Sequence, residues 1–338
     1  MKRSKPIQPP DRAMAWWISG IRSEESGETW VTPGLSLVPL HMGGHSARAE
    51  GAHLTRPMNK GTTRSRSITD NCTFPSPCGI SLKHVLITGG ALRLGATLCR
   101  AFTQAGWQVW CHYQRSAPAA LALQASLQAT GATVRLVQAD LAQSAEVERM
   151  MAHITQTTGP LDCVVNNASL FEPDEGRDMD LQGARQQIEV NLIAPMLLAS
   201  LMAQQAAPEA KPGQRSVVHI LDQKVFNLNP DYFSYTVSKL ALERAVALQA
   251  QALAPLRVCG LAPGLMFLSG PQTQENFDRN SRVNLLREPI DPAQVAATCL
   301  FLAQNPCITG TTVCVDNGQH LVPLARDVMF LGEPKDPA

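Results

Sequence analysis

The sequence has little charge and no excess of one sign. Charged residues make up 17% of the 338 positions, and 29 basic against 28 acidic residues leave a formal net charge of +1. Binding to nucleic acid or to an anionic membrane surface usually depends on a basic excess. No apolar run reaches the roughly 18 to 20 residues that a membrane-spanning helix needs. We therefore expect neither a nucleic acid nor a membrane among the partners.

The sequence also lacks a cysteine framework. None of the nine cysteines forms a CxxC pair with a matching Cys or His partner, which argues against a zinc site. A disulfide scaffold is not expected either, so a reducing cytoplasm is the natural setting. Six cysteines stand singly within apolar runs and are expected to be small buried hydrophobic residues. They are Cys99, Cys111, Cys163, Cys259, Cys299 and Cys314.

Residues 1–81 differ in composition from the rest of the chain. They are rich in Gly, Ser, Thr, Pro and Arg and show no sustained period of 3.6 or 2. Such a composition does not support a core, so we expect a disordered N-terminal extension. One alternative is upstream sequence included by an early start codon. Another is an organelle transit peptide, although Glu24, Glu25, Glu28 and Glu50 argue against an acid-poor segment.

From Leu82 to residue 325, short β-branched runs alternate with longer amphipathic stretches, and the overall hydrophobic content of 44% allows a sizeable core. This alternation is typical of βαβ units. We predict a single α/β domain with a Rossmann-like doubly wound parallel sheet, followed by a C-terminal tail at 326–338. The predicted strands are His84–Thr88, Gln108–Tyr113, Thr133–Gln138, Leu161–Asn166, Ser216–Leu221, Arg257–Leu261 and Thr312–Val315. The predicted helices include Leu94–Ala105, Ser144–Gln156, Asp180–Gln205, Ser234–Ala254 and Pro292–Gln304.

A glycine turn follows the first predicted strand, in Thr88-Gly89-Gly90-Ala91-Leu92-Arg93-Leu94-Gly95. Glycine lets the backbone approach a pyrophosphate, and the N-terminus of the next helix offers it free N–H groups. Its position between the first strand and the first helix predicts a dinucleotide site. We expect Gly89, Arg93, Leu94 and Gly95 to contact the cofactor.

The end of the second strand predicts which dinucleotide is bound. His112-Tyr113-Gln114-Arg115-Ser116 contains no acid, whereas an NAD site usually places Asp or Glu here for the ribose 2′-hydroxyl. His112, Arg115 and Ser116, with Arg93 nearby, suit the 2′-phosphate of NADPH, because guanidinium groups bind phosphate bidentately. The alternative is that these residues are solvated loop cations.

Polar residues also follow the third and fourth strands. Asp140, in Ala139-Asp140-Leu141, is expected to accept a hydrogen bond from the adenine amino group, with Leu141 beside it. Asn166-Asn167-Ala168 ends the fourth strand. Strand ends of a doubly wound sheet open into a crevice, so these residues are expected to lie along the cofactor.

The strongest local signal is Tyr235-Thr236-Val237-Ser238-Lys239, which follows the fifth strand. Tyr235 and Lys239 are four residues apart and share one face of the predicted helix. A nearby ammonium favours phenolate and is expected to lower the pKa of Tyr235 from about 10. The phenol then becomes a usable proton donor and acceptor near neutral pH.

Together these motifs resemble the short-chain dehydrogenase/reductase family over roughly Lys83 to Leu321. Besides the glycine turn, the Asn-Asn-Ala motif and the Tyr/Lys pair, the resemblance rests on Asn191, Pro263-Gly264 and the closing Val315-Asp316-Asn317-Gly318. Asn317 stands where the family has glycine, far from the chemistry. The resemblance implies that Asn191 keeps a proton-relay water in place and that Pro263 and Gly264 contact the cofactor. It also implies a homotetramer or homodimer built on the long helices.

Within this family, the chain is similar to the pteridine reductases and to the bacterial dihydromonapterin and dihydrofolate reductases related to them. Arg93 replaces the third glycine of the turn, and the second strand ends in His-Tyr-x-Arg-Ser. Asp222, thirteen residues before Tyr235, replaces the usual serine. Ser169-Leu170-Phe171 follows the Asn-Asn-Ala motif. The resemblance implies that Ser169 contacts the pterin and the cofactor and that Phe171 stacks on the pterin ring.

Asp222 favours a C=N substrate over a ketone on physical grounds. A ketone reductase needs a hydrogen-bond donor at the developing oxyanion, which an ionised carboxylate would repel. The nitrogen of a C=N bond gains a proton as hydride reaches the carbon, and pterin N–H groups can donate to a carboxylate. The alternative is that Asp222 caps a loop and faces solvent.

These residues lead to the hypothesis that the chain reduces a dihydropteridine of the biopterin, monapterin or folate type with NADPH. Tyr235 would relay the proton with Asp222, Lys239 would hold the nicotinamide ribose, and Arg93 would lie near the cofactor phosphate and the pterin. Leu265 is expected at the substrate and begins Leu265–Pro289, a substrate-closing loop in the family; a solvated insertion or an oligomer contact are the alternatives. Rival functions are a ketone, quinone or 3-oxoacyl reductase and a non-catalytic NADPH-binding sensor.

Overall fold

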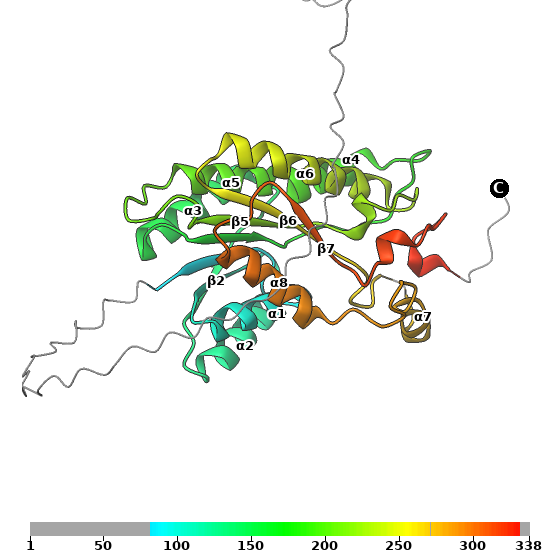
Figure 1. Cartoon of the computed structure of the whole chain (residues 1–338), viewed down its shortest axis with the longest axis horizontal. Helices are drawn as coiled ribbons and strands as arrows, with labels where there is room; N and C mark the ends of the chain where they lie inside the picture. Colours follow the sequence, from blue (N-terminus) through cyan, green and yellow to red (C-terminus); the bar gives the residue numbers. More distant parts are fainter. Residues whose placement is uncertain (1–81, 271, 332–338) are drawn as a thin grey trace, which may run out of the picture. The chain divides into compact units, whose positions relative to one another are not determined.

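The centre of the structure is a parallel sheet of seven strands in the order β3-β2-β1-β4-β5-β6-β7 (Figure 1). The computed structural model describes residues 82–270 and 272–331, so the expected disordered extension at residues 1–81 lies outside the described residues. The strands are β1 (His84–Ile87), β2 (Gln108–Tyr113), β3 (Val134–Gln138), β4 (Cys163–Asn166), β5 (Ser216–Ile220), β6 (Arg257–Pro263) and β7 (Thr312–Val315). This order and the parallel pairing confirm the predicted Rossmann-like sheet.

Helices cover both faces of the sheet (Figure 1). One layer contains α1, α2 and α8, and the other contains α3 to α6. These helices are α1 (Arg93–Gln104), α2 (Ala117–Gln128), α3 (Ser144–Thr158), α4 (Leu181–Ile188), α5 (Ala194–Gln204), α6 (Phe233–Ala252) and α8 (Pro292–Gln304). None of the helices in the described part of the chain has the length and apolar character needed to cross a membrane.

Alternate residues of a strand pack against the two helix layers, as the pleat of a strand requires. In β1, Val85 and Ile87 lie in one core cluster with residues of α1 and α8, whereas Leu86 lies in the other with residues of α3 and α5. All three side chains are fully buried, and each contributes roughly 1.5–3 kcal/mol of stability. Because both faces are covered, the strands read as continuous apolar runs.

Two segments differ from the predicted elements. The single helix expected over Asp180–Gln205 contains a π-helical turn, η1 (Glu189–Ile193), between α4 and α5. Such a turn inserts an extra residue into a helix, a change too local to be read from the hydrophobic period of one sequence. The segment Leu265–Pro289, in which no periodicity is visible, contains the short helix α7 (Gln274–Asn280). The side chain of Thr273 caps this helix by accepting a hydrogen bond from the Asn276 N–H.

The C-terminal tail predicted at 326–338 begins inside the packed structure instead. Residues 328–330 form a 3-10 turn, η4 (Val328–Phe330), and Asp327, Val328 and Met329 are buried. The carboxylate of Asp231 accepts hydrogen bonds from the Asp327 N–H at 2.6 Å and from the Arg326 guanidinium at 3.0 Å. A boundary at residue 325 is therefore wrong, because polar contacts that no sequence period reveals hold the segment up to Leu331, the last residue described here.

The strand order creates a crevice at the carboxyl ends of β1 and β4. These neighbouring strands lead into helices on opposite faces of the sheet, which is where a doubly wound fold binds its ligands. In the glycine turn after β1, Gly89 has a φ of +60°, and a Cβ there would meet the Ala168 backbone at 3.0 Å. A Cβ on Gly95 would overlap the carbonyl oxygen of Gly89. The approach of α1 to the turn therefore requires glycine at position 95, and the positive φ and the nearby Ala168 backbone favour it at position 89.

We expect Gly95→Ala to cost about 1–3 kcal/mol of unfolding free energy, because the overlap forces the turn or α1 to move. Binding of NADPH, the expected cofactor, should weaken with it. Urea unfolding and a fluorescence titration with NADPH would measure the two effects. Gly176→Ala is a matched control, since a Cβ there would make only ordinary contacts, at 3.4 Å or more, with Phe233. Equal losses in both variants would contradict this account of the turn.

Candidate active site

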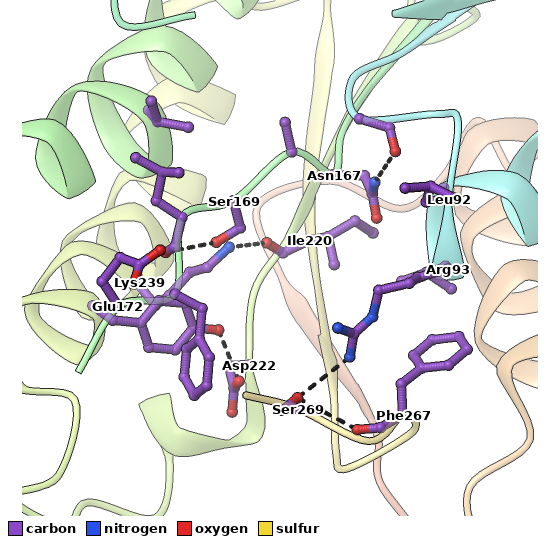
Figure 2. Close-up of a pocket in the computed structure, with 18 of the residues that line it drawn as sticks. Leu92, Arg93, Asn167, Ser169, Glu172, Ile220, Asp222, Lys239, Phe267 and Ser269 are labelled. Atoms are coloured by element: carbon purple, nitrogen blue, oxygen red, sulfur yellow. Dashed lines mark hydrogen bonds between the residues drawn. The ribbon is translucent and has the colours of Figure 1, made fainter. Parts of the chain in front are cut away.

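A cavity of about 960 Å³ opens at the carboxyl ends of the strands, and Figure 2 shows part of its lining. Its volume is near the upper end of the range for small-molecule sites, about 300–1,000 Å³. Of the residues predicted for the site, Asn166 and Asn191 are buried outside the cavity lining, and all the others line it. These residues are Gly89, Arg93, Leu94, Gly95, His112, Tyr113, Arg115, Ser116, Asp140, Leu141, Asn167, Ala168, Ser169, Phe171, Asp222, Tyr235, Lys239, Pro263, Gly264 and Leu265.

The glycine turn is held from both neighbouring strands. The Gly89 N–H donates to His112 Nδ1 at 3.1 Å, from the end of β2. On the β4 side, the Asn167 side chain donates to the Thr88 and Gly89 carbonyls at 2.9 and 3.1 Å. Thr88 Oγ1 in turn accepts the N–H groups of Asn167 and Ala168. Asn167 therefore holds the glycine turn in its conformation, because its side-chain amide donates both hydrogen bonds to the backbone of the turn.

His112 does not serve as a phosphate-binding cation. Burial lowers its pKa from the ordinary value of 6.5 to about 4, so the ring is neutral at pH 7. Nδ1 accepts the Gly89 N–H, and Nε2, 3.1 Å from the Ala139 carbonyl, is therefore the protonated nitrogen. Both ring nitrogens have backbone partners, so a 2′-phosphate contact from His112 stays a prediction that this geometry does not favour. Arg115 is exposed at the cavity wall, with Ser116 beside it, and remains suited to that role.

Arg93 adopts a φ of +50°, in the left-handed region that favours glycine. Its guanidinium donates to the Leu268 carbonyl at 3.0 Å and to Ser269 Oγ at 3.3 Å, and Figure 2 shows it directed at Ser269. It also lies 5.3 Å from the centre of the Phe267 ring. Arg93 thus connects the glycine turn to the segment after β6, a contact that the sequence does not predict.

Tyr235, Asp222 and Lys239 meet at the end of β5. Tyr235 Oη donates to Asp222 Oδ2 at 2.8 Å, and the Lys239 ammonium donates to the Ile220 carbonyl at 2.8 Å. Asp222 Oδ1 accepts the Lys224 N–H at 2.8 Å and so caps the 3-10 turn η2 (Gln223–Val225). Asp222 therefore does cap a loop, but its second oxygen is directed at Tyr235 rather than at solvent.

The electrostatics of this group differ from the prediction. Burial raises the pKa of Tyr235 well above its usual value, and the Asp222 carboxylate raises it further. Asp222 contacts the phenol directly, whereas the Lys239 ammonium lies 5.8 Å from the ring centre, so the expected lowering of this pKa is wrong. Burial also lowers the pKa of Lys239 to about 8 and raises that of Asp222. At neutral pH the phenol is protonated and is a hydrogen-bond donor.

Asn191 lies on the π-helical turn, fully buried and outside the cavity lining. Its carbonyl oxygen accepts from the Leu170 N–H at 2.8 Å and from Ser169 Oγ at 3.1 Å. Its NH₂ group donates to the Leu170 carbonyl at 2.9 Å and to Ser238 Oγ at 3.1 Å. These four bonds use the full capacity of the amide. The side chain therefore positions the segment at Ser169, and it has no group left for the expected relay water.

Phe171 borders the reacting groups. Its ring lies edge-on to Tyr235, with 4.7 Å between the ring centres. One face stacks on Tyr232 at 3.9 Å, and Tyr232 continues the stack to Phe330 at 6.1 Å. The ring also lines the cavity, where a flat ligand could contact it.

Sequence reasoning missed four buried polar residues of the cavity wall. The Lys224 ammonium forms an ion pair with Asp327 at 2.9 Å. Gln319 Oε1 accepts the Leu265 N–H at 2.9 Å and holds the start of the segment after β6. Gln223 Oε1 is buried without a hydrogen-bond partner among the described residues. Gln223 and Lys224 could have been found from the sequence, because they follow Asp222 directly. Gln319 and Asp327 lie too far along the chain from their partners, Leu265 and Lys224, for the sequence to suggest the contact.

Known proteins match most of the region that the structure describes. A family model described as enoyl-(acyl carrier protein) reductase matches residues 90–320. The chain belongs to the short-chain dehydrogenase/reductase family. It is therefore an oxidoreductase, and the resemblance inferred from the motifs is confirmed.

The proteins similar to this short-chain reductase include a pteridine reductase, a dihydrofolate reductase and a sugar dehydrogenase. Pteridine reductase 1 from Leishmania tarentolae is 31% identical over 283 residues, which covers 70% of this chain and 96% of that protein. The structure of FolM alternative dihydrofolate reductase 1 from Brucella suis in complex with NADP is similar with a TM-score of 0.68 and 34% identity, covering 72% of this chain and 96% of that one. L-fucose dehydrogenase from Mus musculus is 28% identical over 253 residues, covering 71% and 89%.

We expect His112 to make the stability of this short-chain reductase depend on pH. Its folded pKa of about 4 lies below the ordinary value of 6.5, so the unfolded chain binds the extra proton between these values. The contribution of the neutral His112 ring to the free energy of unfolding is complete above pH 6.5. It is lost as the pH falls toward 4, by about 1.4 kcal/mol per pH unit.

His112→Gln removes the titrating ring, so the loss of unfolding free energy between pH 6 and pH 5 should be smaller by about 1.4 kcal/mol than in the wild type. Urea unfolding at the two pH values would measure the difference. Because the carboxylates titrate in both proteins, their contribution cancels. An unchanged pH dependence in the variant would contradict the buried, neutral state of His112.

Proposed function

We propose that this short-chain reductase transfers hydride from NADPH to the C=N bond of a dihydropteridine. The observation that carries the proposal is the 2.8 Å hydrogen bond from Tyr235 to Asp222 at the end of β5. A carboxylate here accepts N–H donors from a ligand and disfavours a developing ketone oxyanion. The matches to pteridine reductase 1 and to FolM alternative dihydrofolate reductase 1 support the same substrate class.

The crevice fits a dinucleotide phosphate. Gly89 and Gly95 leave space at the turn that a Cβ would fill, and the turn lies beside the N-terminus of α1. Arg115 and Ser116 would hold the 2′-phosphate, because no acid competes for that position. Asp140 would accept the adenine amino group. When bound, NADPH supplies the hydride.

Tyr235 would deliver the proton to the substrate nitrogen. Because its pKa is raised, the phenol keeps its proton until a basic nitrogen takes it. The raised pKa of Asp222 suits a group that passes a proton to Tyr235 after each transfer. Lys239, with a pKa near 8, would donate hydrogen bonds to the nicotinamide ribose and keep the base of the cavity positive for much of the neutral range.

The remaining wall suits a flat heterocycle with N–H donors. Phe171 offers a ring surface, and Ser169 lies at the same side of the cavity. Beside Asp222, Gln223 adds a buried acceptor that has no hydrogen-bond partner within residues 82–270 and 272–331. A pteridine carries an aromatic face and N–H groups together, which supports this class. The homodimer or homotetramer, the cytoplasmic setting and the substrate-closing role of Leu265–Pro289 remain predictions.

We expect Tyr235→Phe to abolish turnover and leave the affinity for NADPH unchanged, because the phenol carries the proton and the ring remains. Asp222→Asn should lower kcat by about 10²–10⁴, the usual contribution of acid–base groups. NADPH oxidation would be followed at 340 nm with dihydrobiopterin, dihydromonapterin, dihydrofolate and a simple diketone.

Turnover of a pteridine and not of the diketone is the expected result for the wild type. Turnover of the diketone alone would instead assign a carbonyl reductase. Tight NADPH binding without oxidation of any substrate would assign a sensor. Full activity of Tyr235→Phe would remove the proton-transfer role on which the proposal rests.

We also expect Arg115 to set the preference for the phosphorylated cofactor. Arg115→Ala should raise the Kd for NADPH roughly tenfold to a hundredfold, the value of a charge-assisted hydrogen bond of about 1.5–3 kcal/mol. The Kd for NADH should change little, since NADH lacks the 2′-phosphate. Arg149→Ala is the control, because Arg149 lies on α3 and does not line the cavity. Equal loss of both cofactors in Arg115→Ala would contradict this role.

A further inference from the structure

The segment Arg326–Phe330 forms one wall of the cavity. Asp327, Val328 and Met329 line it and are 8%, 5% and 4% exposed. This wall belongs to neither the glycine turn nor the strand ends that would hold the cofactor. It comes from the last part of the described chain, and none of the motifs in the sequence points to it.

The ammonium of Lys224 holds this wall in place. Only 2% of its side chain is exposed, and it donates to Asp327 Oδ2 at 2.9 Å, to Asn229 Oδ1 at 2.7 Å and to the Asp231 carbonyl at 3.1 Å. These bonds use all three ammonium hydrogens. A buried charge is tolerated only with such complete pairing, so the wall has one favoured position relative to Lys224.

The wall lies at the substrate end of the cavity. Lys224 follows Asp222 by two residues, and its N–H donates to the Asp222 carboxylate. Tyr232 donates from Oη to Met329 Sδ at 2.8 Å, and its ring stacks on Phe171. The segment is therefore linked to the two side chains that would contact the pteridine, to Asp222 through Lys224 and to Phe171 through Tyr232.

A second set of contacts joins the wall to α7. Asn276 donates to the Met329 carbonyl at 3.0 Å, and Asn280 donates to the Val328 carbonyl at 2.9 Å. The wall is thus held between η2 on one side and α7 on the other. Its position is determined by contacts far from the cofactor residues.

We infer that Arg326–Phe330 is a specificity-determining wall of the pteridine site and that Lys224 is the positioning residue that sets it. This inference rests on the proposed function. The wall limits the space for the substituent that the pteridine ring carries. Met329 is the bulkiest of the wall residues that line the cavity. Lys224 acts through Asp327 and does not touch the reacting atoms.

The test compares kcat/KM for dihydrobiopterin, with its short side chain, and for dihydrofolate, with its long one. Met329→Ala should raise the ratio of dihydrofolate to dihydrobiopterin by about tenfold, the usual size of discrimination by a hydrophobic wall. Lys224→Met should raise KM for both pteridines by about tenfold or more, with less effect on kcat. The Kd for NADPH should stay within about twofold in both variants, because the hydrogen bonds of the wall run to Lys224 and α7 and not to the glycine turn.

Arg149→Met is the matched control, since it removes an exposed cation 3.8 Å from Glu146 on α3. Asp327→Asn keeps the shape of the wall and loses the charge of the pair, so it replaces Lys224→Met if that variant does not fold, and the same rise in KM is expected. An unchanged substrate ratio in Met329→Ala, or an unchanged KM in the pair variants, would overturn the inference. A wild-type protein that reduces no pteridine would instead overturn the proposed function.

Discussion

The hydrogen bond between Tyr235 and Asp222 is the contact on which the rest of the site depends. Asp222 follows the end of β5 by two residues, and Tyr235 follows the start of α6 by two, so the bond closes the connection between a central strand and its neighbouring helix. Lys224 and Tyr232 lie within this connection. They hold the C-terminal wall and the ring of Phe171, respectively. One connection therefore sets both the proton-transfer geometry and the substrate side of the cavity.

Burial is the main electrostatic influence in the cavity. It raises the pKa of Tyr235 and of Asp222 and lowers that of Lys239, which favours the neutral form of each group. At neutral pH Tyr235 therefore keeps its proton and donates a hydrogen bond to the Asp222 carboxylate, and Lys239 stays charged for much of the neutral range. Lys224 differs from these groups, because three hydrogen bonds hold its ammonium group in one position and its role is structural.

Much of the fold could be predicted, because its signals are local. Apolar runs of the length of a strand, separated by amphipathic stretches, indicate a parallel sheet, and two predicted strands, Gln108–Tyr113 and Thr312–Val315, match the structure at both ends. The π-helical turn and α7 escaped prediction, since a single inserted residue is too local a change to read from one sequence and α7 is too short to show a hydrophobic period. The burial of the segment after residue 325 also escaped, because side-chain and backbone hydrogen bonds from distant residues produce it.

The sequence by itself determined the fold class, the glycine turn and the Tyr235–Lys239 pair. Each depends on residues within a few positions of one another, where strand and helix geometry place side chains without further information. Only the tertiary structure decided the charge state of His112, the raised pKa of Tyr235 and the pairing of Lys224 with Asp327 across 103 positions. Burial and electrostatic interactions are summed over neighbours in space, and those neighbours come from every part of the folded chain.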